Sequence, residues 1–128
     1  MTFVNYAVQR KEPVFEFSQF EPILSVGQMV VNNQGTIVSL NRRFISIWKL
    51  TECVVTARCE RQVFQFIAEH LENPQSFLID MRNVHEQMEL EVKEQLELKN
   101  GRSFMHLTKP QWLEKTVIGR IHLFWPLL

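Results

Sequence analysis

The feature that most constrains the fold is an alternating segment that ends in an Asn-Gly dipeptide near the carboxyl end. Between residues 90 and 98 apolar and polar residues alternate, and the apolar ones are Leu90, Val92, Leu96 and Leu98. Period two is typical of a β-strand with one solvated face. Asn100-Gly101 favours a two-residue type I′ turn, since both central residues of that turn need positive φ. The segment therefore predicts a β-hairpin in which Leu98 faces Ser103 and Leu96 faces Met105.

This register divides the hairpin into two faces. One face would carry Leu96, Leu98, Met105 and Leu107, and the other would carry Phe104 and His106. A last strand over residues 116–125 alternates between two sets of residues that are both largely apolar. Because apolar strand faces must be buried, we expect helices on one side of the sheet and another segment or partner on its outer side.

The amino-terminal half predicts two further strands and then helices. β-rich runs at 28–32 and 36–40 flank a polar Gly-containing turn and suggest a second hairpin. Asn41 is a good cap for a short helix, a second helix is expected around 61–71, and Asn73-Pro74 begins a third. The order ββαααβββ indicates an α+β fold with a five-stranded antiparallel sheet.

Composition excludes several classes of protein. Fourteen basic and fourteen acidic residues cancel, so there is no net charge to attract nucleic acid, while self-association is permitted. Two cysteines are too few for a disulfide framework, and the chain shows neither a signal-peptide start nor an apolar run of about 20 residues. We expect a soluble cytoplasmic protein with no nucleic-acid or membrane partner.

The first 26 residues differ in composition from the rest of the chain. Four of the ten phenylalanines precede position 21, and burying each one is worth about 1.5–3 kcal/mol. Such a segment is expected to cover a sheet face or to meet a partner. The sequence therefore predicts an N-terminal cap or dimerisation segment over 1–26 and a domain over 27–128.

Two groups of residues resemble the PAS domain family. Residues 30–48 look like the family's opening pattern at Gly35, Ile37, Asn41 and Phe44. Residues 98–102, Pro110 and 117–120 look like its closing pattern, most of all in bacterial sensor proteins of cyanobacterial type. The resemblance covers roughly residues 24–125. Asn32 stands where the family usually has Asp, and Trp125-Pro126-Leu127-Leu128 stands where many members have an Asp-x-Thr element and a signalling helix.

The resemblance implies a PAS-like sensing and interaction module without catalysis. Since no kinase, cyclase or DNA-binding domain follows in this sequence, we expect output through protein–protein association, as a homodimer or as an adaptor to a signalling protein. The alternative is a monomer in which residues 10–24 cover the sheet. Candidate interface residues on the expected outer face and in the first segment are Phe15, Phe17, Phe20, Phe104, His106, Ile118, His122 and Phe124.

A small-molecule or cofactor sensor is the second interpretation. Candidate pocket residues are Phe64, Ile67, Phe77, Met81, His85, Met88, Leu96 and Met105. The same side chains would also make a closed core, which we favour. His85 lies where the resemblance places a haem ligand and Cys59 near a flavin-reactive cysteine, but the flavin signature is missing, so no cofactor is expected.

An enzyme on a related α+β cone fold is the third interpretation. Asp80 is the only aspartate, and no Ser/His/Asp set or phosphate-binding glycine loop is present. Glu94 and His85 are the only inward candidates for catalysis. His106 and His122 could be cross-strand neighbours, but a metal site would need a third ligand. We therefore expect neither catalysis nor a metal.

Overall fold

The structure is a computed structural model that describes residues 26–127 of the chain. Its elements are β1 (Gly27–Asn32), β2 (Ile37–Leu40), α1 (Arg42–Trp48), α2 (Glu52–Ala57), α3 (Glu60–Ala68), α4 (Pro74–Glu86), β3 (Val92–Glu97), β4 (Ser103–Leu113) and β5 (Thr116–Pro126). The strands form one antiparallel sheet in the spatial order β2-β1-β5-β4-β3. The predicted α+β fold is confirmed. The short helix α2 was not predicted, since it buries no residue and so has no apolar stripe.

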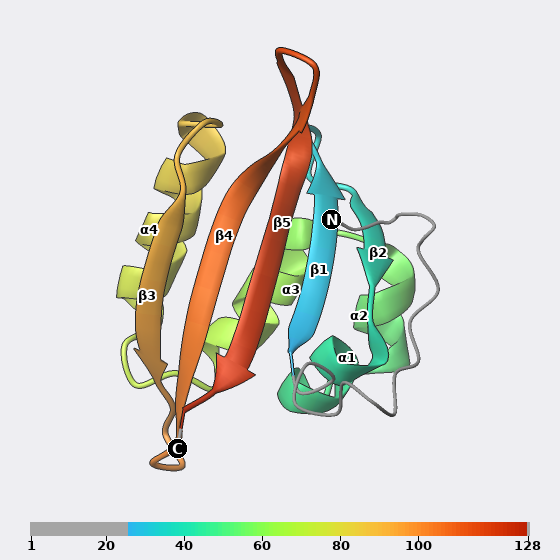
Figure 1. Ribbon diagram of the computed structural model, residues 1–128. Helices are drawn as coiled ribbons and strands as arrows, with labels where there is room; N and C mark the ends of the chain where they lie inside the picture. Colours follow the sequence, from blue (N-terminus) through green and yellow to red (C-terminus); the bar gives the residue numbers. More distant parts are fainter. Residues whose placement is uncertain (1–25, 128) are drawn as a thin grey trace, which may run out of the picture.

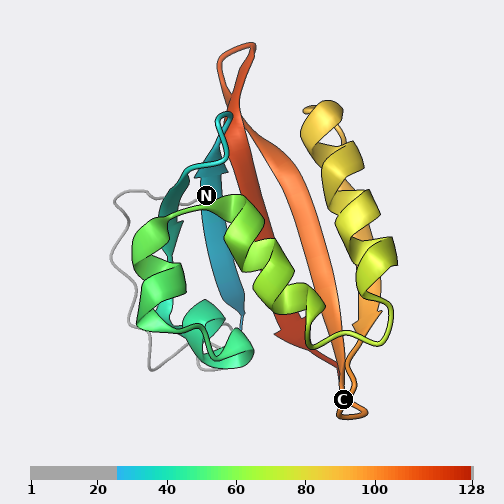
Figure 2. The ribbon, with the colours of Figure 1, turned by 180° about the vertical axis from the view of Figure 1, so that it is seen from behind.

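The four helices lie on one side of the sheet, behind it in Figure 1 and in front of it in Figure 2. Helix α3 crosses the middle of the sheet, and α4 lies along its β3–β4 side. The core fills the space between the two layers. Its large apolar side chains include Met29, Phe44, Trp48, Ile67, Phe77 and Phe124, all almost fully buried.

Two asparagines begin helices as the sequence predicted. The Oδ1 of Asn41 accepts hydrogen bonds from the backbone N–H groups of Phe44 (2.8 Å) and Gln28 (3.0 Å). Asn41 therefore caps α1 and ties it to β1. The Oδ1 of Asn73 accepts from the N–H of Ser76 at 3.2 Å, and Pro74 occupies the first turn of α4.

The β3–β4 hairpin has a different turn from the predicted one. The N–H of Leu98 donates to the carbonyl of Arg102 (2.9 Å), and the N–H of Gly101 donates to the carbonyl of Leu98 (3.0 Å). Gly101 has φ +87°, whereas Asn100 is not among the described residues with positive φ. The loop is therefore three residues long with a left-handed glycine at its end, the next commonest hairpin connection after the two-residue turns.

The longer loop shifts the predicted register by one residue. Glu97 pairs with Ser103 and Leu96 with Phe104. A one-residue shift moves every side chain of a strand to the opposite face. The side chains expected outside but found buried against the helices are Phe104, His106, His122 and Phe124. Met105 and Leu107, expected in the core, lie on the outer face. The face assignments of β4 and β5 were therefore wrong, whereas Leu96 and Leu98 are buried in the core as predicted.

Gly119 is required where β5 passes β1. A Cβ at this position would lie 2.2 Å from the carbonyl oxygen of Val31, and the two paired strands cannot separate without breaking their hydrogen bonds. We expect Gly119→Ala to lower the free energy of unfolding by about 3 kcal/mol, measured by urea denaturation. Gly101→Asn is the matched control. It has open space around it and only the positive φ to satisfy, so it should cost less than about 1 kcal/mol. Equal losses would contradict the steric argument.

Candidate functional site

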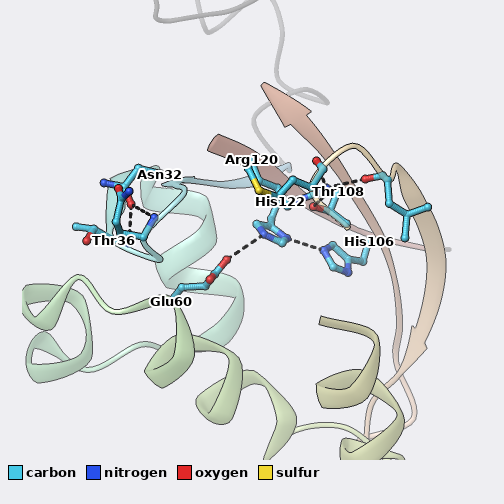
Figure 3. Close-up of polar contacts among 10 residues, drawn as sticks. Asn32, Thr36, Glu60, His106, Thr108, Arg120 and His122 are labelled. Carbon is cyan, nitrogen blue, oxygen red and sulfur yellow. Dashed lines mark hydrogen bonds and ion pairs between the residues drawn. The ribbon is translucent and has the colours of Figure 1, made fainter. Parts of the chain in front are cut away.

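A row of ionisable side chains crosses the interior between the sheet and the helices. His106 Nδ1 lies 3.4 Å from Glu94 Oε2, and His106 Nε2 lies 3.1 Å from His122 Nδ1. His122 Nε2 in turn faces Glu60 Oε2 at 3.7 Å. We call Glu94, His106, His122 and Glu60 the polar array; Figure 3 shows the contacts from His106 to Glu60. Its members come from β3, β4, β5 and α3.

Strand pairing and aromatic side chains hold the two imidazoles in place. His106 pairs with Phe124 and His122 with Thr108, so the two histidines are diagonal neighbours on β4 and β5. The ring of Phe124 stacks on His106 with centroids 4.2 Å apart, and the edge of Phe64 meets His122 at 5.2 Å. Both histidines are 0% exposed. The imidazoles are therefore rigidly oriented and excluded from bulk water.

The ends of the polar array reach the surface although its centre does not. The side chains of Glu94 and Glu60 are 21% and 14% exposed. A groove of about 240 Å³ between α4 and β3 contacts Glu94, and a cavity of about 50 Å³ contacts Glu60 and His122. Asp80 of α4 also interacts with Glu94. Protons can therefore exchange with solvent through the carboxylates at either end.

Arg120 lies beside the polar array and ties three segments together. Its guanidinium donates to the Oγ1 of Thr108 (3.0 Å) and to the carbonyls of Met88 (2.9 Å) and Leu90 (2.7 Å). This buried cation therefore links β5 and β4 to the connection between α4 and β3. Burial lowers the pKa of Arg120, and the negative charge of Glu60 opposes that shift.

Burial controls the protonation of the histidines. It lowers the pKa of His122 to about 4, against the opposing influence of Glu60, and it also lowers the pKa of His106. Burial alone would raise the pKa of Glu94, but the hydrogen bonds with His106 and Asp80, together with the charge that His106 carries when protonated, outweigh it and leave that pKa below its ordinary value. Burial and the neighbouring Glu94 raise the pKa of Asp80. At neutral pH both imidazoles are therefore neutral.

One buried atom of the polar array has no hydrogen-bond partner. His122 Nε2 is fully buried and unpartnered among the described residues, and the 3.7 Å to Glu60 is too long for a hydrogen bond. This nitrogen lies against the cavity of about 50 Å³, whose wall includes Arg120 and Asn32. The cavity has room for a few water molecules and is far smaller than the roughly 300–1,000 Å³ of typical ligand sites.

The predicted pocket residues fall into three groups. Phe64, Met81, His85 and Met88 line the cavity of about 50 Å³. Ile67, Phe77 and Leu96 are buried in the core, with Phe77 and Leu96 also reaching the groove beside Glu94. Met105 lies on the opposite face of the sheet. His85 and Met88 are exposed at the rim, so His85 is not an interior ligand, and it does not share a site with Glu94.

Other predicted residues lie elsewhere. Phe15, Phe17 and Phe20 fall outside the described residues. Ile118 is exposed on the β4–β5 hairpin, and Cys53 and Cys59 are free thiols. Within residues 26–127 no group of three or more His, Cys, Asp or Glu side chains is arranged to hold a metal ion. None of the helices in this range is long and apolar enough to cross a membrane.

The sequence interpretation missed Glu60, Thr108 and Arg120. Thr108 and Arg120 lie two residues from the two histidines on β4 and β5 and therefore face the same side of the sheet. With the correct register, the sequence would have placed all four side chains together. Glu60 could not have been found in this way, since it comes from the first turn of α3 and meets the strands only through the tertiary fold.

Comparison with known proteins identifies the fold. No protein-family model and no curated protein matches this chain. Among solved structures, the chain is similar to the PAS domain of BvgS from Bordetella pertussis, with a TM-score of 0.59 and 11% identity over 89% of this chain and 88% of that one. The PAS domain of the fruit-fly ELK potassium channel gives a TM-score of 0.53 and 17% identity over 87% and 93%.

A third similar structure is the sensor region of a sensor histidine kinase, with a TM-score of 0.59 and 10% identity. That match covers 78% of this chain but only 38% of the other, so this chain spans well under half of the sensor region it resembles. The fold is therefore that of PAS domains, as the sequence patterns indicated. At these identities the similarity defines the fold and leaves function to be argued from the site.

The lowered pKa of His122 makes the stability of the domain depend on pH. The unfolded chain protonates this histidine near pH 6.5 and the folded domain only near pH 4, so acid favours unfolding between these values. We expect the free energy of unfolding to fall by about 3 kcal/mol from pH 7 to pH 4 through His122, measured by urea denaturation at several pH values. His122→Gln should flatten this dependence. His85→Gln changes an exposed side chain outside the polar array and should keep the wild-type slope. An equally steep slope in His122→Gln would contradict the assignment.

Proposed function

We propose that this protein is a PAS-type sensory and signalling module that acts by association with a second copy or with a signalling protein, without catalysis of its own. The observation that carries the proposal is the apolar outer face of the sheet. None of the four described helices lies on this face (Figure 1). An apolar sheet face that the described helices leave free is typical of an interaction surface.

The outer face carries a continuous apolar patch. We define the outer patch as Val30, Met105, Leu107, Ile121, Leu123 and Trp125. Its members are cross-strand neighbours, because Met105 pairs with Trp125, Leu107 with Leu123 and Val30 with Ile121. All of them except Ile121 retain partial exposure.

Polar side chains border the outer patch on the β3 side. Lys93 pairs with Leu107 and Gln95 with Met105, and both are exposed. Lys109, paired with Ile121, adds a second cation. An apolar centre with a polar rim is the anatomy of protein–protein interfaces, and this arrangement supports association rather than a solvated sheet face.

The occupant we propose for the outer patch includes the first 26 residues. This segment is rich in phenylalanine and cannot remain in water at low free energy. We propose that it acts as a cap or dimerisation segment for the domain formed by residues 27–128. Because the described cysteines are free thiols, we also propose the cytoplasm as its location.

A charge in the outer patch should disrupt association. We expect the wild-type protein to sediment as a dimer at micromolar concentration, or to retain a signalling protein in a pull-down, and Leu107→Glu to weaken either interaction at least tenfold. The physical reason is that an interfacial carboxylate would lose its hydration without gaining a partner. Analytical ultracentrifugation over a concentration series measures the effect.

Ile79→Glu is the matched control, because Ile79 is an exposed apolar residue on α4, on the other side of the molecule. It should leave association unchanged. A wild-type protein that is strictly monomeric at high micromolar concentration and retains no partner would contradict the proposal.

A second candidate function is sensing of a small molecule. The unpartnered Nε2 of His122 against a cavity favours it. The cavity of about 50 Å³ would have to expand severalfold to hold a typical ligand, and for this reason association takes precedence. Mass spectrometry of a denatured extract, together with a visible spectrum, tests this candidate. A stoichiometric bound compound would support it, and a colourless, ligand-free protein would count against it.

A further inference from the structure

The polar array contains fewer protons than contacts at neutral pH. Its three contacts in series run from Glu94 to His106, from His106 to His122 and from His122 to Glu60. Each contact joins two atoms that can both accept a hydrogen bond, so each needs one proton to become attractive. Two neutral imidazoles supply two protons and two ionised carboxylates supply none. One contact is therefore left without a proton.

The distances show which contact lacks the proton. The first two contacts, at 3.4 and 3.1 Å, are within hydrogen-bond range, and the third, at 3.7 Å, is not. His122 Nε2 is also the atom of the polar array that has no partner. This pattern fits one tautomer of each ring, in which His106 Nδ1–H donates to Glu94 and His122 Nδ1–H donates to His106. His122 Nε2 then presents a lone pair to the carboxylate of Glu60.

We propose that this contact is a proton-binding switch: the folded domain takes up one proton from solvent between His122 Nε2 and Glu60, and the uptake fastens α3 to the sheet. The proton turns a repulsive contact between two acceptors into a charge-assisted hydrogen bond, which is shorter and about twice as strong as a neutral one. No bond is broken, and the proton enters through the partly exposed Glu60.

Besides the two histidines, the titratable and charged groups around the switch come from α3, α4, β3 and β5. Glu60 belongs to α3, Arg120 to β5, Glu94 to β3, and Asp80 and His85 to α4. Arg120 already donates to Thr108 and to two backbone carbonyls, and Asp80 meets Glu94 at the far end. His85 is exposed at the rim of the cavity. Of these groups, Glu60 is the one that faces the unpartnered nitrogen.

The structural effect of protonation at this contact can reach the surface of the domain through backbone hydrogen bonds. Glu60 lies in the first turn of α3, and its backbone N–H donates to the carbonyl of Gly35 in the β1–β2 turn at 3.0 Å. Ile37 N–H donates to the carbonyl of Arg58 just before α3. Tightening of Glu60 onto His122 therefore acts on the start of α3 and on the exposed β1–β2 turn. This inference does not rest on the proposed association, since a strict monomer would keep the polar array intact.

Nitrogen NMR of labelled histidine rings, combined with hydrogen exchange of backbone amides, tests the switch. At neutral pH we expect His122 to carry its proton on Nδ1 and none on Nε2. As the pH is lowered within the folded range, Nε2 should gain a proton. The amides of Val63 and Phe64 in α3 should then become about twofold to tenfold more protected relative to those of β5, which follow the global stability, and this is the range expected for one added hydrogen bond. Protection factors, corrected for intrinsic exchange at each pH, measure this change.

Glu60→Gln imitates the loaded switch, because the side-chain amide can donate to His122 Nε2 without a proton from solvent. It should show the higher α3 protection already at neutral pH and no further rise in acid. Glu52→Gln is the matched control, since it also removes a carboxylate from the first turn of a helix, with the same effect on the helix dipole. It should behave as wild type.

Three results would overturn the switch. They are a proton on His122 Nε2 at neutral pH, unfolding of the domain before that nitrogen titrates, and α3 protection that does not change on titration. If Glu60→Gln does not fold, the ring-nitrogen titration and α3 protection of the wild-type protein and Glu52→Gln still decide between these outcomes.

Discussion

The register of the β3–β4 hairpin is the constraint on which the interior depends. Three loop residues, closed by Gly101 with φ +87°, make Leu96 pair with Phe104. That pairing turns Phe104, His106 and Thr108 towards the helices and Met105 and Leu107 away from them. With a two-residue turn, the imidazole of His106 would lie on the outer face and the polar array could not form. The left-handed glycine therefore determines the chemistry of the core as well as the path of the chain.

Burying ionisable groups costs free energy, and contacts within the fold offset part of that cost. The two imidazoles are fully buried, and isolated they would destabilise the domain. Aromatic rings, the Glu94 contact and the mutual hydrogen bond offset part of that cost for the neutral forms. For a charged His122, Glu60 offsets only part of the cost of burial, and the nearby charges of His106 and Arg120 add to that cost. The interior is therefore stable at neutral pH and responsive to acid.

Local signals predicted much of the fold. Asn41 and Asn73 were assigned as helix caps from residue type and position, and both accept the expected backbone N–H groups. The alternation of β5 separated Ile121, Leu123 and Trp125 from His122 and Phe124 as the structure does. These features depend on neighbours in the sequence, so a sequence pattern is sufficient to find them.

Features that depend on distant contacts could not be predicted in the same way. Asn-Gly fits both a two-residue and a three-residue loop. The three-residue loop here is accompanied by the bridge between Leu71 and Leu98 and by the hydrogen bond from Lys99 N–H to the carbonyl of His70. Both contacts join the segment just after β3 to the α3–α4 connection. The sequence indicated that both sheet faces are apolar but not which residues occupy which face. Glu60 could not be predicted either, because only tertiary packing brings it close to the histidines.

The central strand β5 serves two surfaces with alternate residues. Arg120, His122 and Phe124 face the helices, while Ile121, Leu123 and Trp125 face outward in the outer patch. Because β5 is the central strand of the sheet and pairs with both β1 and β4, hydrogen bonds hold it on both edges. A proton bound at His122 therefore shifts α3, which carries the partner Glu60, more readily than it shifts the sheet. It follows that the proposed switch and the proposed association face are mechanically separate, with the first acting through α3 and the β1–β2 turn and the second on a rigid sheet.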